Sequence, residues 1–209
     1  MNAYKMNNVE SKLRVLHNDA KKDFSRMRMG IIKSIFRPVQ PSDFEKVYLP
    51  ISREQGETIR ELIIKNNSKY VVEFGTSFGI STIYLADAVR QTGGKIITTE
   101  LLESKAKIAF QNIKDVDLDN YVDLRVGDAM DTLKDLSTPI DFLFLDGWKD
   151  LYLPLFKMLS PLFHRNTMIY ADNMDMAETK EYANYLIKNK NAYSSQVIDE
   201  GKAWLTRVI

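Results

Sequence analysis

The segment Tyr70–Thr82, which reads YVVEFGTSFGIST, decides the predicted fold. Its first part, Tyr70–Gly75, is a short apolar run rich in valine and aromatic residues and predicts a buried strand. Two glycines frame the loop that follows, and Ile80–Arg90 then has the pattern of a helix. A glycine loop at this place lets the backbone approach a ligand closely, and the helix N-terminus offers free amides to an anionic group.

The same order of strand and helix is repeated along the rest of the chain. Four more strands are expected, at Lys95–Glu100, Val122–Val126, Ile140–Asp146 and Thr167–Asp172. The helices expected after them are Ser104–Ile113, a short helix after Asp128, Leu151–Phe163 and Glu178–Lys188, and two short strands around Asp199–Lys202 form a hairpin. Strand–helix units in such a succession predict an α/β fold with an open, doubly wound, mostly parallel sheet. Ligands of these sheets bind at the carboxyl ends of the strands, so the residues that close each strand are the candidates for function.

Composition limits the classes of function that are expected. The chain has 209 residues, which suits one domain with a substantial core, and its formal net charge is +1. This balance gives no support for nucleic-acid binding. The absence of cysteine excludes disulfides, thiol nucleophiles and cysteine-based zinc sites, and two histidines, His17 and His164, argue against a multi-histidine metal site. A chain without cysteine suits a reducing compartment, and we expect a cytoplasmic protein.

Residues 1–50 are expected to form an N-terminal helical extension and an irregular connection before a domain at 51–209. They contain no long apolar run typical of a membrane span or a secretory signal. Apolar residues spaced by three or four predict an amphipathic helix, and they are Val9, Leu13, Leu16, Ala20 and Phe24. We favour a helix that packs on the core with its basic face in solvent; a membrane-surface or partner helix is the alternative. Pro38, Pro41 and Pro50 indicate the irregular connection, and Ser52 with Gln55 forms a capping box for the next helix.

Residues at the ends of the first two strands point to a nucleoside-containing cofactor. Glu100 closes the second strand, where a carboxylate can accept hydrogen bonds from both ribose hydroxyls. Each feature alone has a simpler explanation, because the glycine loop can be a plain turn and Glu100 can be a solvated acid. The loop lacks the lysine of a P-loop and the spacing of the dinucleotide fingerprint, so nucleoside triphosphates and NAD are disfavoured.

The loop also matches the nucleophile elbow of hydrolases, G-x-S-x-G, with Ser77 as the candidate nucleophile. Asp146 and His164 follow it in the order of a catalytic triad. The serine-hydrolase interpretation is disfavoured, because the residues before Tyr70 lack the pattern of the strands that normally precede such an elbow. His164 is also expected far from Ser77, between a helix and a strand.

A group of hard oxygen ligands is expected at the ends of the fourth and fifth strands. Asp146 closes one strand and Asp172 with Asn173 closes the other, so the three side chains converge if the strands are neighbours. Carboxylate and amide oxygens with room for water and substrate describe a Mg²⁺ site. The alternative is that both aspartates only cap the helices that follow. Lys149 is expected either in the same cavity or on the surface, which is the usual place of a lysine.

Taken together, these motifs resemble a known family. VVEFGTSFGIST, Glu100, VGDA at Val126–Ala129, FLDGWKDLYLP and YADN resemble class I S-adenosylmethionine-dependent methyltransferases. LDGWKDLYLP followed by ADN is most similar to catechol O-methyltransferase and related bacterial O-methyltransferases. The resemblance extends roughly from Tyr48 to the C-terminus. It implies a Rossmann-like, doubly wound sheet of seven strands, the last one antiparallel, with helices on both sides.

The resemblance also implies a role for each matching residue. Cofactor-binding residues would be Glu73, Gly75, Ser77 and Ser81 at the methionine moiety, Glu100 at the ribose, and Leu101, Asp128, Ala129 and Trp148 around the adenine, with Ile51 and Asp146 also in contact. Metal ligands would be Asp146, Asp172 and Asn173, and Lys149 would be the catalytic general base. Two positions depart from the pattern. Gly147 stands where catechol O-methyltransferase has a histidine, and Glu200 is the nearest acid to the place of its substrate-contacting glutamate.

The implied function is an O-methyltransferase that uses S-adenosylmethionine and a divalent metal, expected to be Mg²⁺. Its acceptor would be a small molecule with vicinal hydroxyls, such as a catechol, and we expect no nucleic-acid or membrane partner. The metal would lower the pKa of the attacking hydroxyl, and Lys149 would take its proton. A metal-independent methyltransferase, a serine hydrolase and a cofactor-binding protein with little catalysis are the alternatives. The oligomeric state stays open, with a homodimer as one option.

Overall fold

The computed structural model describes residues 3–27 and 40–209 of the chain. Helix α1 spans Ala3–Ala20, and a short helical segment follows at 23–27. Of the prolines expected in an irregular connection, Pro38 lies outside the described residues, whereas Pro41 begins a 3-10 turn, Pro41–Phe44. Among the described helices, none is long and apolar enough to cross a membrane.

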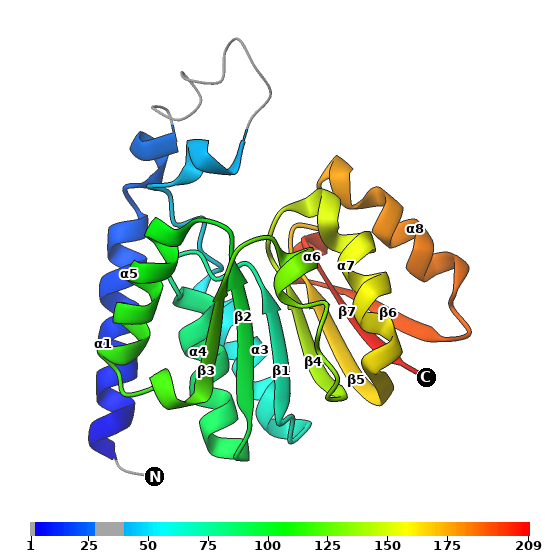
Figure 1. Cartoon of the computed structure of the whole chain (residues 1–209), viewed down its shortest axis with the longest axis horizontal. Coiled ribbons are helices and arrows are strands. Elements are labelled where there is room, and N and C mark those ends of the chain that lie inside the picture. Colours follow the sequence, from blue (N-terminus) through cyan, green and yellow to red (C-terminus); the bar gives the residue numbers. More distant parts are fainter. Residues whose placement is uncertain (1–2, 28–39) are drawn as a thin grey trace.

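A seven-stranded sheet forms the centre of the described part of the chain (Figure 1). Its strands are β1 (Tyr70–Phe74), β2 (Lys95–Glu100), β3 (Val122–Val126), β4 (Ile140–Leu145), β5 (Phe163–Ala171), β6 (Tyr193–Ile198) and β7 (Ala203–Val208). The spatial order is β3-β2-β1-β4-β5-β7-β6, and β7 runs antiparallel to both of its neighbours, whereas the other pairs are parallel. The expected doubly wound sheet with an antiparallel last strand is therefore confirmed. The strand order reverses between β1 and β4, which is where ligands bind in such sheets.

Helices cover both faces of the sheet, because the central strands are apolar on both sides. One layer contains α1, α3 (Arg53–Lys65), α4 (Ile80–Thr92) and α5 (Glu103–Lys114), and the other contains α6 (Ala129–Thr132), α7 (Tyr152–Leu159) and α8 (Lys180–Lys188). Alternate strand residues such as Val71 and Phe142 join the first cluster, and their neighbours Val72 and Leu143 join the second. The central strands β1 and β4 thus contribute to two hydrophobic cores.

The N-terminal helix packs against the core, as the favoured interpretation of its sequence predicts. Val9, Leu13 and Leu16 are buried in the same cluster as residues of α3 and α4. An ion pair of 2.7 Å between Lys12 and Asp115 holds α1 beside the end of α5, and Figure 1 shows the two helices side by side. The expectation for Phe24 is wrong: its side chain is 77% exposed, because α1 ends at Ala20 and the chain turns before residue 23.

Two of the later helices begin or end in short 3-10 turns and differ in their bounds from the sequence expectation. The helix expected at Leu151–Phe163 is divided into a 3-10 turn, α7 and a second 3-10 turn, and Phe163 already begins β5. Pro161 in the second turn accounts for this end, because proline cannot donate the backbone hydrogen bond that would continue an α-helix. His164 therefore lies within β5. The last helix likewise starts later than expected, at Lys180, after a 3-10 turn at Ala177–Thr179.

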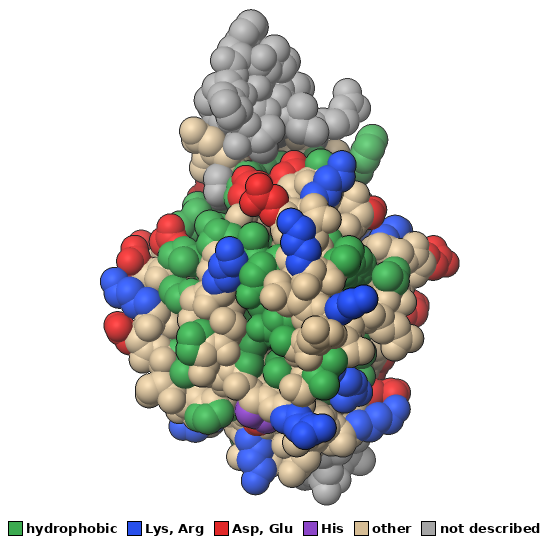
Figure 2. All heavy atoms as spheres, turned by 90° about the vertical axis from the view of Figure 1, so that its right-hand side faces the viewer, with side chains coloured by type: hydrophobic (Ala, Val, Ile, Leu, Met, Phe, Trp, Pro, Cys, Tyr) green, Lys and Arg blue, Asp and Glu red, His purple; other side chains and the backbone are tan. Residues whose placement is uncertain are grey.

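The surface beyond the C-terminal strands carries charges of both signs. Figure 2 shows this end of the molecule, where Lys and Arg side chains lie apart from one another among hydrophobic and uncharged ones. Large hydrophobic side chains are exposed on the C-terminal elements, with Ile187 on α8, Val197 on β6 and Ile209 at the end of the chain. A cavity lies elsewhere, at the carboxyl ends of the parallel strands.

Candidate active site

A cavity of about 710 Å³ opens at the carboxyl ends of β1, β2, β4 and β5. Its volume is in the range of small-molecule sites. Most of the residues singled out from the sequence line it, namely Ile51, Gly75, Ser77, Ser81, Glu100, Leu101, Asp128, Ala129, Asp146, Trp148, Lys149, Asp172 and Asn173. Glu73 is fully buried and does not line the cavity. The sheet topology thus brings together residues from six separate segments of the chain.

The glycine loop after β1 has a conformation that requires small side chains. Gly75 has a φ of +107°, and a Cβ at this position would lie 2.8 Å from the carbonyl oxygen of Asp146. Glycine is needed here because the backbone segments that follow β1 and β4 approach each other closely. Ser77 has a φ of +50°, which is uncommon for a residue with a side chain and persists only where surrounding contacts enforce it.

The contacts of Glu100 hold this loop in place. Its Oε2 accepts a hydrogen bond from the amide of Ser77 at 2.8 Å, and its Oε1 accepts one from the amide of Leu102 at 2.9 Å. The hydroxyl of Ser77 donates to the carbonyl oxygen of Tyr48 at 2.8 Å. Glu100 is therefore an ordered acid at the cavity wall rather than a solvated one. Each carboxylate oxygen has capacity for a further hydrogen bond from a ligand hydroxyl.

Glu73 lies inside the sheet, in a network of threonine hydroxyls. Its Oε2 accepts hydrogen bonds from Thr82 and Thr98, both at 2.6 Å, and Thr98 also bonds to Thr76 at 2.6 Å. Its Oε1 is buried without a hydrogen-bond partner in the described residues. Burial raises the pKa of Glu73 to about 7. The side chain supports the loop from within, and its contact with a cofactor stays a prediction.

The three expected metal ligands lie at the ends of adjacent strands. In the parallel pair of β4 and β5, Leu145 is opposite Ala171, so Asp146 and Asp172 follow at the same level. The amide of Asp172 donates to the carbonyl of Leu145 at 3.0 Å. Asn173 has a φ of +55°, a left-handed conformation that asparagine tolerates better than most residues. The two aspartates and Asn173 thus line the same edge of the cavity.

Lys149 and Asp146 form a partly buried ion pair at this edge. Lys149 Nζ lies 3.1 Å from Asp146 Oδ1 and 5.3 Å from the centre of the Tyr152 ring. The lysine side chain is 14% exposed, so it is not an ordinary surface lysine. Burial raises the pKa of Asp146 to about 6, with the Lys149 ammonium opposing this shift and the Asp172 carboxylate adding to it. Burial also raises the pKa of Asp172.

Asp128 caps a helix, whereas Asp146 and Asp172 are not N-cap residues. Asp128 caps α6, because its Oδ1 accepts a hydrogen bond from the amide of Met130 at 2.8 Å. The turns after β4 and β5 have Trp148 and Met176 as N-cap residues, and neither of these makes a side-chain cap hydrogen bond. Capping therefore does not account for Asp146 or Asp172.

Apolar side chains form the wall of the cavity near Trp148. Trp148 and Leu101 are exposed, and the ring of Phe44 lies 6.5 Å from the ring of Trp148. At the neighbouring position, a Cβ on Gly147 would lie 2.5 Å from the ring of Phe74. Phe74 therefore occupies the space that a side chain at position 147 would need. This packing explains why glycine stands at position 147.

The serine-hydrolase constellation is not assembled. Ser77 follows the carboxyl end of β1, whereas His164 lies near the amino end of the parallel strand β5, at the opposite end of the sheet. His164 Nε2 is 2.9 Å from Oδ1 of Asp141, and the Ser77 hydroxyl donates to the backbone of Tyr48. A triad of Ser77, Asp146 and His164 is therefore excluded by position.

Two polar residues that contact the site are not signalled as site residues by the sequence motifs. Gln55 Nε2 donates to Asp172 Oδ1 at 3.0 Å, while its Oε1 accepts from the amide of Ser52 in the capping box at 2.8 Å. Lys105 Nζ donates to the carbonyl of Val47 at 2.9 Å and lies 3.4 Å from the Ser77 hydroxyl, and burial lowers the pKa of this lysine. The capping box is a partial signal for Gln55. Nothing in the sequence signals Lys105, because its main partner is a backbone carbonyl far along the chain.

Comparison with known proteins finds O-methyltransferases similar to this chain. A family model described as O-methyltransferase matches residues 42–181. Catechol O-methyltransferase of Niastella koreensis is 33% identical over 130 residues, which cover 60% of this chain and 58% of that protein. Catechol O-methyltransferase B of Danio rerio is 30% identical over 152 residues, covering 69% of this chain and 57% of that protein. The aligned part thus spans less than two thirds of the length of these relatives.

Solved structures share the fold. The O-methyltransferase from Bacillus cereus, in complex with SAH, superposes with a TM-score of 0.68 at 24% identity, covering 88% of this chain and 90% of that chain. A likeness at this identity shows that the two proteins have the same fold. Because the family model covers well over half of the sequence, the chain belongs to the O-methyltransferase family. The resemblance seen in the motifs is therefore confirmed at the level of the family.

Proposed function

We propose that this protein transfers a methyl group from S-adenosylmethionine to a hydroxyl of a small molecule with vicinal hydroxyls, of the catechol type, and that it requires a divalent metal. The observation that supports this most is the presence of Asp146, Asp172, Asn173 and Lys149 in the same cavity as the glycine loop and Glu100. Residues 51–209 would form the methyltransferase domain, with residues 1–50 as an extension. We place the reaction in the cytoplasm, since a chain without cysteine suits a reducing compartment.

The residues of the cavity suit S-adenosylmethionine, which supplies an electrophilic methyl group when bound. The loop of Gly75 and Ser77 brings backbone and hydroxyl groups to the place where the methionine moiety would lie. Glu100 is held by two backbone amides and can accept hydrogen bonds from ribose hydroxyls. Leu101 and Trp148 offer apolar surface to an adenine ring. The relatives from Niastella koreensis and Danio rerio are catechol O-methyltransferases by name, which supports this assignment.

The donor set at the strand ends suits a hard divalent cation such as Mg²⁺. Asp146, Asp172 and Asn173 offer two carboxylates and one amide oxygen. Lys149 contacts one oxygen of Asp146 and Gln55 contacts one oxygen of Asp172, and each carboxylate has a second oxygen. Burial and the neighbouring Asp172 disfavour the charged form of Asp146, and a cation would relieve this conflict. When bound, the metal would lower the pKa of an acceptor hydroxyl.

The chain's own residues supply the rest of the chemistry. Lys149, in its neutral form, takes the proton of the acceptor hydroxyl at Nζ, and Asp146 at 3.1 Å stabilises the ammonium that results. The apolar side chains of Phe44, Leu151 and Met176 line the cavity and exclude water from the reacting oxygen. Alignment of that oxygen with the methyl group and the sulfur contributes much of the rate.

A second candidate is a methyltransferase that needs no metal, which the Asp146–Lys149 ion pair favours. In this candidate the ammonium itself neutralises Asp146, and Asp146 and Asp172 orient the acceptor. Among the described residues, no group of three or more His, Cys, Asp or Glu side chains forms a metal cluster, and the proposed site therefore depends on the amide of Asn173. Metal removal distinguishes the two candidates.

We expect methylation of catechols to vanish in EDTA and to return when Mg²⁺ or Mn²⁺ is added. Calorimetric binding of S-adenosylhomocysteine should largely persist in EDTA, because Glu100 and the glycine loop belong to other strands. Asp172→Ala should reproduce the effect of EDTA. Asp175→Ala, which changes an exposed carboxylate that does not line the cavity, is the matched control.

The two assays separate the outcomes. Full activity in EDTA would contradict the metal requirement and favour the second candidate. Absence of S-adenosylhomocysteine binding would contradict both candidates.

A further inference from the structure

One wall of the cavity is an irregular segment, residues 47–51, which we call the strap. Tyr48, Leu49, Pro50 and Ile51 all line the cavity. The strap contains no helix or strand, so backbone hydrogen bonds of regular structure do not fix its course. Its conformation must therefore depend on contacts with other parts of the chain.

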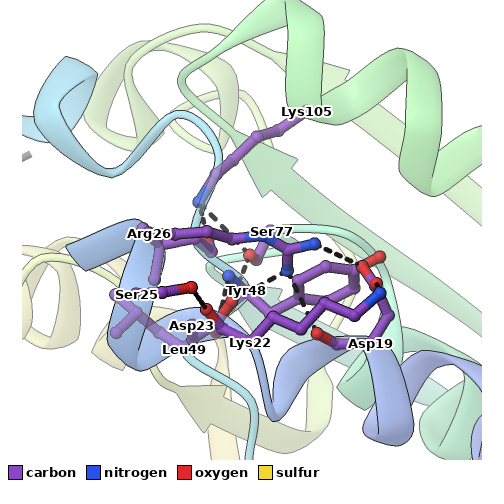
Figure 3. A network of polar contacts seen from close by, with 10 residues as sticks. Asp19, Lys22, Asp23, Ser25, Arg26, Tyr48, Leu49, Ser77 and Lys105 are labelled. Atoms are coloured by element: carbon purple, nitrogen blue, oxygen red, sulfur yellow. Dashed lines mark hydrogen bonds and ion pairs between the residues drawn. The ribbon is translucent and has the colours of Figure 1, made fainter. Parts of the chain in front are cut away.

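Asp23, which follows α1, binds the strap directly. Its Oδ2 accepts hydrogen bonds from the amides of Tyr48 and Leu49 at 2.8 and 3.0 Å (Figure 3). Leu49 has a φ of +47°, which is unfavourable for a residue with a branched side chain. Two hydrogen bonds to an ionised carboxylate are strong enough to hold such a backbone. Asp23 is 7% exposed, so little water is available to replace it.

Arg26 holds Asp23 in this position. Its Nη1 donates to Asp23 Oδ1 at 3.1 Å, and its Nη2 lies 2.7 Å from Asp19 Oδ2. The guanidinium also lies over the ring of Tyr48, at 5.4 Å from its centre. Figure 3 shows the side chains of Asp19, Asp23 and Arg26 gathered around Tyr48. The buried carboxylate thus has a counter-ion, and both groups contact the strap.

The other side of the strap is bound by residues of the site. Lys105 Nζ donates to the carbonyl of Val47 at 2.9 Å, and the Ser77 hydroxyl donates to the carbonyl of Tyr48 at 2.8 Å. The amide of Ser77 in turn donates to Glu100 at 2.8 Å. A continuous series of hydrogen bonds therefore connects the end of the N-terminal helix with the glycine loop and Glu100, and it passes through the strap.

We propose that Asp23 is a positioning residue for the cofactor-binding cavity. By binding the amides of Tyr48 and Leu49, Asp23 fixes the position of the cavity wall. It thereby also positions the carbonyl of Tyr48, which accepts the hydrogen bond of the Ser77 hydroxyl. The affinity for the cofactor thus depends on a carboxylate that lies outside the cavity lining, in the N-terminal extension. This inference rests on the proposed binding of S-adenosylmethionine.

The test compares S-adenosylhomocysteine binding by calorimetry in the full chain and its variants. Asp23→Ala should weaken binding about ten- to a hundredfold, because hydrogen bonds to a charged group that order the cavity wall are lost. Asp23→Asn keeps one oxygen for the strap amides but loses the charge that faces Arg26, so a smaller loss of at least about threefold is expected. In steady-state assays with a catechol, the KM for S-adenosylmethionine should rise more than kcat falls.

Asp115→Asn is the matched control. Asp115 also forms an ion pair with the N-terminal region, through Lys12, but it neither lines the cavity nor contacts the strap. This variant should lower the melting temperature without changing the affinity for S-adenosylhomocysteine. If Asp23→Ala does not fold, Asp23→Asn decides the question.

Wild-type affinity in the folded Asp23 variants would overturn the inference, as would an equal loss of affinity in Asp115→Asn. Wild-type protein that binds no S-adenosylhomocysteine would overturn the proposed function as well. Binding by the wild type with unchanged affinity in the variants would overturn the inference alone.

Discussion

The Nζ of Lys149 lies 3.1 Å from the Asp146 carboxylate and 5.3 Å from the centre of the Tyr152 ring. If it removes the proton of the acceptor, Lys149→Met should lower the turnover of a catechol by about 10²–10⁴-fold, the usual loss for a general base. Calorimetry should show nearly unchanged affinity for S-adenosylhomocysteine, because Glu100 and the glycine loop are untouched.

Lys157→Met is the control for the Lys149 variant. Lys157 Nζ also lies over a tyrosine ring, that of Tyr185, at 5.2 Å from its centre, but Lys157 does not line the cavity. Its replacement should leave turnover close to the wild-type value. Normal turnover in Lys149→Met would show that the lysine has a structural role as the partner of Asp146.

At the scale of elements, the N-terminus of α3 is connected to the end of β5. The capping box of Ser52 and Gln55 begins α3, and the side-chain amide of Gln55 reaches on to Asp172 at 3.0 Å. Gln55 thus takes part in the capping box of α3 and also orients a carboxylate of the site. The stability of the helix and the orientation of Asp172 can be separated by mutation, because the two functions use different atoms of Gln55.

We expect Gln55→Glu to keep the capping box, since a carboxylate oxygen can still accept from the amide of Ser52. The variant replaces the donor to Asp172 with a negative charge, so turnover should fall about ten- to a hundredfold. Ser52→Ala should show the opposite pattern, a loss of roughly 1 kcal/mol in the free energy of unfolding with turnover largely retained. Urea denaturation and a catechol assay measure the two effects, and wild-type turnover in Gln55→Glu would contradict the role of Gln55.

At the scale of the whole molecule, Glu73 links β1, β2 and α4 in the middle of the fold through Thr98 and Thr82. Burial raises its pKa to about 7 from an ordinary value of 4.5. The folded state therefore favours the neutral form of Glu73, and this preference contributes to the free energy of unfolding. The contribution is complete below about pH 4.5, where Glu73 is protonated in the unfolded chain as well, and it is lost as the pH rises through 7.

The free energy of unfolding of the wild type should consequently fall, relative to Glu73→Gln, by about 3 kcal/mol between pH 4.5 and 7.5. Other titrating groups, including Asp146, are common to both proteins and cancel in the difference. Urea denaturation of both proteins across this pH range measures the effect. Parallel stability curves would show that Glu73 stays ionised in the fold.

The order of the elements and the residues at the strand ends were determined by the sequence alone. Short apolar runs such as Ile140–Leu145 can be buried only as strands covered on both faces, and five strand–helix units in succession allow few topologies. Because parallel strands place their carboxyl ends at one edge, the sequence pattern is enough to predict Glu100, Asp146 and Asp172 in one site. The local sequence pattern was sufficient here because the candidate functional residues stand at the end of a strand or directly after it.

Only the tertiary structure decided which contacts hold that site together. Asp23, Gln55 and Lys105 act on backbone atoms or side chains far along the chain, and neither spacing nor periodicity encodes such partners. Phe24 fits the helical stripe in sequence, but its exposure follows from the end of α1 at Ala20. Gly147 is explained only by the ring of Phe74, which occupies the neighbouring space. Periodicity reports which face of an element is buried, whereas these contacts depend on how separate elements are oriented in space, and packing of the whole chain alone sets that orientation.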